Sequence, residues 1–507
     1  MIDIYQIGTP VYVPEQRSQL PRLLHESLAA AEPELLAAMA GFLDQPDPEA
    51  FLRLEETALR LLQLVSSHMV AGVLALLHRR QSWVDAAVEE AREASPRPMR
   101  RRDSRETPVR FLGGAKLRIK TAYVTEDLRG RPGPRRGTGR RRKSGSGSYP
   151  VLEAVGTTHR ATPALQSEVA RQVVRGASNA EAREALAERG IELNVKTVRA
   201  LALAVGALAL EQRQARIDVA REGGLFSNEY AGKRIVISAD GGRVRLRKGG
   251  RRGRRNKKGR RHYETPWKEP KLVVVYVIDE RGKKVRKIRP LYDATMEDAD
   301  VTFEILSAEL MLRGAAKAKE IILTGDGAPW IWNRADTLAR ALGLDSQKIV
   351  KVADFYHAVE HLTAIADLCA SWSPTERKKW VRRMRRNLKA GNVDMVIEAA
   401  RALCKGRNAG RIRTEVEYFV ERKDRMRYDE FRRRGIPLGS GAVESAIRRV
   451  INLRLKGPSV FWYRENAECV LHMRSYLKAG RWDELMRRVM HRSPDGMPAC
   501  ETVRKAA

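Results

Sequence analysis

Two hydrophobic patterns divide the chain. Leucine and alanine recur at helical spacing through residues 20–43 and 51–65, and the segment Asp-Gln-Pro-Asp-Pro separates these two stretches. From residue 233 onward, the pattern changes to short β-branched and aliphatic runs that end in glycine, which is typical of buried strands. The sequence therefore predicts a helical N-terminal domain with a structural or oligomerising role over residues 1–97, and an α/β domain that begins near residue 231.

The α/β domain is expected to contain a mixed sheet. Short connections between its first three strands predict antiparallel pairing, and the later strands are reached through helices, which predicts parallel pairing. This order corresponds to a ribonuclease H-like fold. The predicted strands cover residues 235–247, 272–278, 285–291, 320–324 and 348–352, and the predicted helices cover residues 298–312, 329–342 and 354–370.

An all-helical insertion is expected inside this domain. Residues 371–435 show the pattern of basic amphipathic helices and contain no predicted strand. The insertion divides the core into a first part at 231–370 and a last part at 436–482, where helices continue to about residue 455 and from 462 to 482. Residues 483–507 are interpreted as a C-terminal tail.

Three further segments connect the N-terminal helices to the α/β domain. Residues 98–128 alternate apolar and basic side chains around Gly113 and Gly114, which predicts a basic β-hairpin. Residues 129–150 are rich in arginine and glycine and are interpreted as a flexible linker, with a phosphate-following basic tail as a compatible alternative. Residues 151–230 are interpreted as a helix-turn-helix DNA-binding domain.

The helix-turn-helix prediction depends on capping residues. A first helix is expected at 163–174, Ser178 and Glu181 form an S-x-x-E capping box for the second, and Asn194 caps the third. In this motif the N-terminal residues of the recognition helix reach into a DNA groove. A small helical bundle without DNA-binding activity shows the same pattern, so that alternative stays open. The residues predicted to contact DNA are Lys196, Thr197 and Arg199.

The charge of the chain indicates a polyanionic partner. The 507 residues include 96 Lys and Arg against 62 Asp and Glu, a net charge of +34 at pH 7. Nucleic acid is the usual partner for such an excess. A membrane surface is the competing partner, but the basic residues are spread over several segments and do not flank a hydrophobic anchor. The apolar stretch 61–77 contains Gln63, Ser66, Ser67 and His68, so it is expected to be a buried helix and not a membrane span.

The cysteines and the N-terminus indicate a reducing compartment. Cys369, Cys404, Cys469 and Cys500 form no C-x-x-C pair, which argues against a zinc ribbon and against a secreted disulfide scaffold. Residues 1–16 lack the basic region and apolar core of a signal peptide. A cytoplasmic location is therefore expected.

Three carboxylates stand where predicted core elements begin or end. Asp240 and Asp326 each follow an apolar run and precede glycine, and Glu444 lies in the first turn of a helix after a glycine-rich segment. Carboxylate oxygens are the preferred ligands of Mg²⁺, and a pair of such ions is what two-metal phosphoryl transfer requires. The alternative for Asp240 and Asp326 is that they are ordinary aspartates in turns. The alternative for Glu444 is that its negative charge only interacts favourably with the helix dipole. Glu465 and Glu468 are the fallback third acids.

Basic and aromatic residues near these acids are candidate DNA contacts. A polar loop at 248–261 is expected to project from the strand that carries Asp240 and to grip phosphates. Trp330, Trp332 and Trp462 are candidates for stacking on an unpaired base, with core packing as the alternative. The predicted phosphate contacts are Arg251, Arg252, Arg254 and Arg255.

Five motifs in a fixed order resemble those of bacterial insertion-sequence transposases of the ISKra type, which are similar to Mutator-like DDE transposases. The resemblance covers residues 150–480 and implies a ribonuclease H-like catalytic domain with a helical insertion. It implies that Asp240, Asp326 and Glu444 are the first, second and third catalytic acids. The motifs are ISADGG, the strand pair within HYETPWKEPKLVVVYVIDERGK, ILTGDGAPWIW, DFYHAVEHL, and PLGSGAVESAIRRVINLRLKG followed by FWYRENAE.

The resemblance also implies a site-adjacent role for Asp354 and His357, which match a D-x-x-H motif between the second acid and the insertion. His361 lies one helical turn further on and is interpreted as structural. Many relatives carry a cysteine-rich, zinc-finger-like segment nearer the N-terminus, and this sequence lacks one.

The expected function is that of a DDE transposase in the bacterial cytoplasm, associated with the nucleoid. It would cleave the transposon ends and join them to target DNA with two Mg²⁺ or Mn²⁺ ions and without structural zinc. Asp240 would bridge the ions, and Asp326 and Glu444 would each hold one. The expected partner is double-stranded DNA bound by a homodimer or higher oligomer, with no membrane. The alternatives are a ribonuclease H-like nuclease without strand transfer and a domesticated helix-turn-helix regulator.

Overall fold

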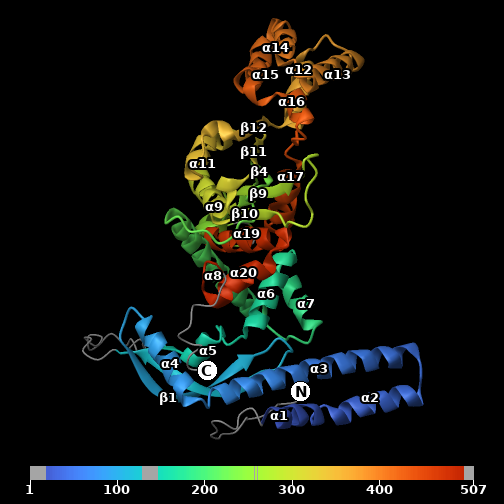
Figure 1. The fold of residues 1–507 in the computed structure, drawn as a ribbon. Coiled ribbons are helices and arrows are strands. Elements are labelled where there is room, and N and C mark those ends of the chain that lie inside the picture. Colours follow the sequence, from blue (N-terminus) through green and yellow to red (C-terminus); the bar gives the residue numbers. More distant parts are fainter. Residues whose placement is uncertain (1–18, 128–146, 256, 258, 260, 496–507) are drawn as a thin grey trace. The chain divides into compact units, whose positions relative to one another are not determined.

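A computed structural model describes residues 19–127, 147–255, 257, 259 and 261–495 (Figure 1). The described residues fall into two compact units, and the division lies between Val205 and Gly206. Both units contain helices and strands, so the chain is a mixed α/β protein, in agreement with the predicted fold class.

The first unit contains the predicted helices and hairpin. Strands β1 (Met99–Arg110) and β2 (Lys116–Glu126) pair antiparallel, and Gly114 adopts a φ of +86° in the turn between them. The hairpin buries apolar side chains against the long helix that precedes it. The other elements are α1 (Gln19–Ala29), α2 (Glu32–Asp44), α3 (Pro48–Leu77), α4 (Gln81–Glu93), β3 (Gly147–Ser148), α5 (Pro150–Ala154), α6 (Pro163–Arg175) and α7 (Asn179–Ala187).

Helix α3 differs from the buried helix that the sequence predicts. Leu59, Leu62, Val70 and Val73 of this helix are each 50–61% exposed. Among the described residues, α3 is the one helix long and apolar enough to cross a membrane, which is weak evidence for a span. The prediction of a buried helix is confirmed for one face, where Leu61, Val65, Ala71 and Leu74 are at most 8% exposed, and wrong for the other, because periodicity identifies an apolar face but not what covers it.

The helix-turn-helix pattern has the predicted elements and caps. The Ser178 hydroxyl accepts a hydrogen bond from the Glu181 N–H at 3.0 Å, and the Asn194 side chain accepts one from the Thr197 N–H at 2.8 Å. The Glu181 carboxylate bonds the Ala177 N–H at 2.9 Å, one residue earlier than a regular capping box. Helix α8 (Val195–Arg221) is much longer than a recognition helix requires.

A five-stranded mixed sheet forms the centre of the second unit (Figure 1). Its order is β10-β9-β4-β11-β12, in which β4 pairs antiparallel with β9 and parallel with β11. β9 pairs antiparallel with β10, and β11 pairs parallel with β12. The mixed pairing therefore agrees with the prediction. The strands are β4 (Arg234–Gly241), β9 (Lys271–Ile278), β10 (Leu291–Thr295), β11 (Glu320–Gly325) and β12 (Ile349–Ala353).

Three predicted elements of this region are corrected. The third strand lies at β10 and not at 285–291, because its apolar residues follow Pro290, which cannot donate a ladder hydrogen bond. The first predicted strand, 235–247, is split into β4 and the short β5 (Val244–Arg245). The predicted helix at 329–342 is broken into α10 (Pro329–Trp332) and α11 (Ala335–Ala341).

One face of the sheet carries the main hydrophobic core. Ile235, Ile237 and Ala239 of β4 pack there with side chains of α9 (Ala299–Leu312) and α11. Helix α9 begins after Asp298, whose side chain accepts a hydrogen bond from the Val301 N–H at 3.1 Å. On β4, α17 (Gly441–Ile447) also packs against the strand. Because side chains alternate along a strand, the residues between those of the core point to the opposite face.

The polar segment at 248–261 is a two-stranded ribbon and not the predicted loop. β6 (Lys248–Arg255) pairs antiparallel with β7 (Arg261–Glu264), and two register shifts interrupt the ladder. Hydrogen bonds between the two strands pair their backbone N–H and C=O groups, although no hydrophobic core covers these strands. A shorter pair forms between β5 and β8 (Trp267–Lys268).

Helices make up the rest of the second unit. The insertion is all-helical, as predicted, and its helices pack together with α12 (Figure 1). The predicted tail is corrected, because α20 lies within it and buries Leu485 and Val489. The helices are α12 (Phe355–Leu368), α13 (Pro374–Lys389), α14 (Val393–Arg401), α15 (Ala409–Arg422), α16 (Tyr428–Arg433), the π-helix η6 (Arg448–Asn452), α18 (Leu453–Leu455), α19 (Arg464–Ala479) and α20 (Trp482–His491), with short 3₁₀ turns η2 (Ala315–Lys317), η3 (Ser346–Lys348), η4 (Gly406–Asn408) and η5 (Lys423–Arg425).

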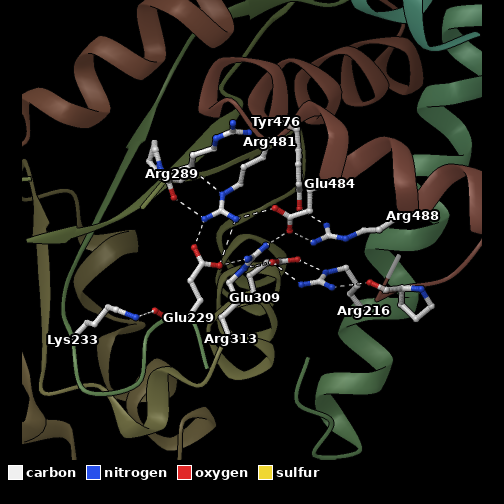
Figure 2. Close-up of polar contacts among 12 residues, drawn as sticks. Arg216, Glu229, Lys233, Arg289, Glu309, Arg313, Tyr476, Arg481, Glu484 and Arg488 are labelled. Carbon is white, nitrogen blue, oxygen red and sulfur yellow. Dashed lines mark hydrogen bonds and ion pairs between the residues drawn. The ribbon is translucent and has the colours of Figure 1, made fainter. Parts of the chain in front are cut away.

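A buried network of arginines and glutamates joins α8, α9 and α20 (Figure 2). Glu309 of α9 receives two hydrogen bonds from Arg216, at 2.5 and 2.9 Å, and one from Arg313 at 3.1 Å. The neighbouring guanidinium groups hold the pKa of Glu309 well below its usual range, against the effect of burial. The other members are Glu229, Arg481, Glu484 and Arg488.

Replacing Glu309 with glutamine should destabilise the second unit strongly. Arg216 and Arg313 would stay buried without their counter-charge, which costs about 3–5 kcal/mol of the free energy of unfolding. Urea denaturation at pH 7 measures this change. The matched control is Glu304→Gln on the same helix, because Glu304 pairs with Arg221 at the surface and both side chains are exposed. Equal effects of the two substitutions would contradict the role of the network.

Candidate active site

The pairing of β4 with β11 brings Asp240 and Asp326 together. Ser238 pairs with Thr324 in this parallel ladder, and the two aspartates each come two residues after that pair. They therefore stand at the same level on neighbouring strands, whose backbones lie about 4.8 Å apart. Side chains alternate along β4, and Ile235, Ile237 and Ala239 point into the main core. Asp240 therefore points to the opposite face, against which α17 packs.

Glu444 reaches the same place from α17. This helix packs against both β4 and β9. The pKa of Asp240 is raised to about 6, mainly by burial and also by the charges of Asp326, Glu444 and Glu269, against the lowering effect of the Gly241 N–H. Carboxylates that influence each other's ionisation lie close together in space, so the three acids chosen from the sequence are neighbours in the structure.

Each of the three acids is oriented by a local hydrogen bond. Asp240 accepts from the Gly241 N–H at 2.6 Å, and Asp326 accepts from the Ala328 N–H at 3.0 Å. The Ser440 hydroxyl has a single hydrogen, which it shares between the closer Asp354 and Glu444 at 3.3 Å. In each case one carboxylate oxygen is engaged, and no described residue donates to the other. Those second oxygens are available to a cation.

The donor set fits a hard divalent cation such as Mg²⁺. Carboxylate oxygens are its ordinary ligands, and Asp240, Asp326 and Glu444 each present one unbonded oxygen. Among the residues that the structure describes, no three His, Cys, Asp or Glu side chains form a group that could hold a metal ion. The three carboxylates would therefore have to move closer together to share a metal ion.

Asp354 is a positioning residue for Glu444. It is 1% exposed and caps α12, accepting from the N–H groups of Tyr356 and His357 at 2.6 and 3.2 Å. Its other oxygen accepts from the Ser440 N–H at 2.6 Å and from the Ser440 hydroxyl. The same hydroxyl contacts Glu444, so Asp354 ties the start of α12 to the helix that carries the third acid.

The insertion holds the turn that follows Asp326. Gly327 adopts a φ of +108°, a conformation that side chains rarely allow. Arg422 of α15 donates to the Gly327 carbonyl at 2.9 Å, and the Tyr418 hydroxyl donates to the Asp326 carbonyl at 3.3 Å. A Cβ atom at position 327 would lie 2.8 Å from Arg422 and 2.9 Å from Tyr418, so only glycine fits there.

Glu269 is a fourth carboxylate that the sequence analysis missed. Its charge acts on Asp240, and a Cβ at Gly241 would lie 2.0 Å from its Oε1 atom. Lys271 lies 3.5 Å away and balances part of the charge. Glu269 lies within the motif HYETPWKEPKLVVVYVIDERGK, but that motif predicts only a strand pair. Glu269 stands in the connection before β9 and becomes a neighbour of Asp240 only through the β4–β9 pairing.

The fallback third acids have other surroundings. Glu468 is 7% exposed and bonds Arg213 at 2.5 Å, the Thr295 hydroxyl at 2.7 Å and the Met296 N–H at 2.6 Å. These partners saturate the carboxylate, which leaves Glu468 a structural role. Glu465 lies exposed in the first turn of α19, where it adds a negative charge beside the helix N-terminus.

The predicted DNA contacts differ in accessibility. Lys196 and Arg199 are exposed in the first turns of α8, and Thr197 is half-buried. Arg255 is exposed on β6, whereas the side chains of Arg251, Arg252 and Arg254 lie outside the described residues.

The predicted stacking tryptophans are mostly packed. Trp332 is 6% exposed in the main core, which corrects its proposed stacking role, and Trp330 packs partly against the same core. Trp462 donates to the Leu455 carbonyl at 3.2 Å, and Arg454 lies 4.8 Å from its ring centre.

Comparison with known proteins adds no family assignment. No protein-family model matches the chain, and no curated protein matches it.

Replacing Asp240 with asparagine should stabilise the metal-free protein at pH 8. The pKa of Asp240 is about 6 when folded, against an ordinary value of 3.8, so ionisation at high pH costs folding free energy. This penalty is absent below pH 3.8 and complete above pH 6, where the substitution should add about 3 kcal/mol. Denaturation with urea at both ends of this range, with a chelator present, measures the difference. A stabilisation that is the same at pH 3.5 would contradict the assigned cause.

Proposed function

We propose that the protein is a DDE transposase that cleaves transposon DNA ends and joins them to target DNA. The observation that carries the proposal is the convergence of Asp240, Asp326 and Glu444, which come from two neighbouring parallel strands and one helix. The motif resemblance to ISKra-type transposases names the same three residues.

We infer further that the sheet is that of a ribonuclease H-like fold. The antiparallel order β10-β9-β4 followed by parallel β11 and β12 supports this inference, because it is the order expected from the sequence for that fold. The all-helical insertion between the second and third acids supports it as well.

The proposed reaction has two steps. Water attacks a phosphodiester at each transposon end, forming a new P–O bond while the bond to the 3′ oxygen breaks and leaves a 3′-hydroxyl. That hydroxyl then attacks a phosphodiester of target DNA, so that a new P–O bond joins the two DNAs while the target's bond to its own 3′ oxygen breaks and leaves a 3′-hydroxyl; no covalent enzyme intermediate forms. Two Mg²⁺ or Mn²⁺ ions, when bound, would stabilise the attacking and leaving oxygens.

The side chains of the protein supply positioning. Asp240, Asp326 and Glu444 would hold the ions, and Asp354 orients Glu444 through Ser440. Arg422 keeps the turn after Asp326 in its left-handed conformation. Fixed geometry of this kind accounts for a large share of the rate in phosphoryl transfer.

The partner of this activity is double-stranded DNA. The net charge of +34 supports binding to a polyanion, and exposed Lys196 and Arg199 at the start of α8 support groove contact by the helix-turn-helix. A homodimer or higher oligomer on DNA, in the bacterial cytoplasm, is part of the same proposal.

A ribonuclease H-like nuclease is the second candidate. The same acids would serve it, since hydrolysis is the first step of both reactions. Incubation with labelled flanking DNA and Mg²⁺ separates them, because a transposase yields joined products and a nuclease yields only cut ones. Cleavage that persists after rigorous removal of divalent ions would rule out both.

Replacing Glu444 with glutamine should abolish cleavage and joining while DNA binding stays nearly unchanged. The substitution removes a metal-binding oxygen but no phosphate contact. Gel-based cleavage assays and a parallel binding titration measure the two properties. The matched control is Glu465→Gln, which removes an exposed carboxylate from α19 and should leave cleavage intact. Cleavage by Glu444→Gln at a normal rate would refute the third acid.

The two sets of basic residues should contribute differently to DNA binding, one to sequence preference and the other to overall affinity. Alanine at Lys196 and Arg199 should change the preference among sequences by roughly 10- to 100-fold, since these residues are expected to reach base edges. Neutralising the predicted phosphate contacts should weaken binding to all DNA equally and reduce its salt dependence. Binding titrations at several salt concentrations test this division, and identical effects from both sets would refute it. The second set is Arg251, Arg252, Arg254 and Arg255.

A further inference from the structure

Two histidines of α12 face each other through their ring nitrogens. His357 and His361 are one helical turn apart, and their Nε2 atoms lie 3.2 Å from each other. The ring centres are 4.8 Å apart and the rings are nearly perpendicular, at 86°. The side chains are 36% and 23% exposed, so the pair is accessible to solvent.

The outer nitrogen of each ring faces a carboxylate. His357 Nδ1 lies 3.0 Å from Glu360, and His361 Nδ1 lies 2.6 Å from Glu415 of α15. An ionised carboxylate only accepts hydrogen bonds, so each Nδ1 must carry the hydrogen. A neutral imidazole has one N–H, and both Nε2 atoms are then left with lone pairs directed at a neighbour that cannot donate. A cation is required to make this arrangement favourable.

A proton is the simpler cation, but the surroundings of the pair oppose it. Burial lowers the pKa of His361, and the charges of His357 and Arg422 lower it further, while Glu415 raises it. The lowered pKa of His361 therefore favours the uncharged state of that ring.

A transition-metal ion fits the observed separation. In a tetrahedral zinc site the nitrogens lie 2.0–2.1 Å from the metal, which places two of them about 3.3 Å apart. Metal-bound histidines commonly donate their other N–H to a carboxylate, as both histidines do here. Glu360 and Glu415 together outweigh the charge of the nearby Arg422, so the surroundings favour a divalent cation.

We propose that His357 and His361 bind a divalent transition-metal ion of the zinc class through their Nε2 atoms. Imidazole ligands favour zinc, copper, iron or nickel over Mg²⁺, so this site is chemically distinct from the carboxylate site. The described residues provide no third His, Cys, Asp or Glu ligand beside the pair, so water completes the coordination. The sequence-based expectation of no structural zinc rests on the lack of a suitable Cys or His ligand set, and this proposal departs from that expectation.

The ion would lie where α12 meets α15 of the insertion, although both of its protein ligands belong to α12. Tyr418 of α15 stacks on His361 at 3.7 Å with an angle of 20° between the rings, and Glu415 belongs to the same helix. Through Tyr418 and Arg422 that helix also holds the backbone after Asp326. The proposed site thus borders the helix that holds this turn, and its existence does not depend on the proposed transposase activity.

Metal titration of the metal-free full-length chain tests the proposal. Competition with a chromophoric chelator should give one Zn²⁺ per chain, and Co²⁺ should produce the visible absorption of nitrogen-ligated cobalt. His357→Ala and the more conservative His357→Gln should both lose this binding. Glu415→Gln should weaken it roughly 10- to 100-fold, because the partner that orients His361 is lost.

The control variants separate this site from its surroundings. His25→Ala removes an exposed histidine of α1 and should leave zinc binding unchanged, and so should Asp326→Asn at the carboxylate site. Zn²⁺ should raise the melting temperature of the wild type but not that of His357→Gln. Less than one Zn²⁺ per chain at micromolar metal, or equal binding by wild type and both His357 variants, would overturn the proposal. DNA takes no part in these measurements, so their failure is independent of the proposed function.

Discussion

The parallel hydrogen-bonded ladder between β4 and β11 is the constraint on which the candidate site depends. Its register fixes Asp240 and Asp326 at the same level on adjacent strands. A slip of one residue would send one aspartate to the opposite face, into the core formed with α9 and α11. The apolar residues of both strands make that slip costly, so burial on one face of the sheet determines the chemistry on the other.

The site then depends on segments remote in sequence. Asp354 and Ser440 connect the end of the sheet to α17 across 86 residues, and Arg422 reaches Gly327 across 95 residues. The buried ion pairs of Glu309 and the neighbouring arginines join α8, α9 and α20. These polar contacts connect segments that are distant in sequence, and most of the contacts are buried. They position acids that are themselves partly accessible to solvent.

Much of the fold could be read from the sequence where local signals are strong. The caps at Ser178 and Asn194 and the apolar runs of β4, β9 and β11 all predicted elements that the structure contains. Local signals failed where tertiary contacts decide. The position of β10 and the exposed face of α3 depend on partners elsewhere in the fold, and periodicity does not carry that information.

The candidate site divides in the same way. The three acids are marked by glycine and by strand ends, so they could be chosen from the sequence. Glu269 is a neighbour of Asp240 only through strand pairing, and the Glu415–His361–His357–Glu360 chain exists only because α15 packs on α12. Glu468 is a carboxylate that could bind a metal ion, but its hydrogen bonds to buried partners give it a structural role.

The left-handed turn at Gly327 has a consequence for the order of assembly. Its hydrogen-bond partner, Arg422, is synthesised 95 residues later, and Glu444 later still. A chain still emerging from the ribosome carries Asp240 and Asp326 but lacks both the side chain that fixes the second acid and the third acid itself. The protein therefore acquires its complete set of carboxylates only when nearly the whole polypeptide has been made, and a prematurely terminated chain lacks that set.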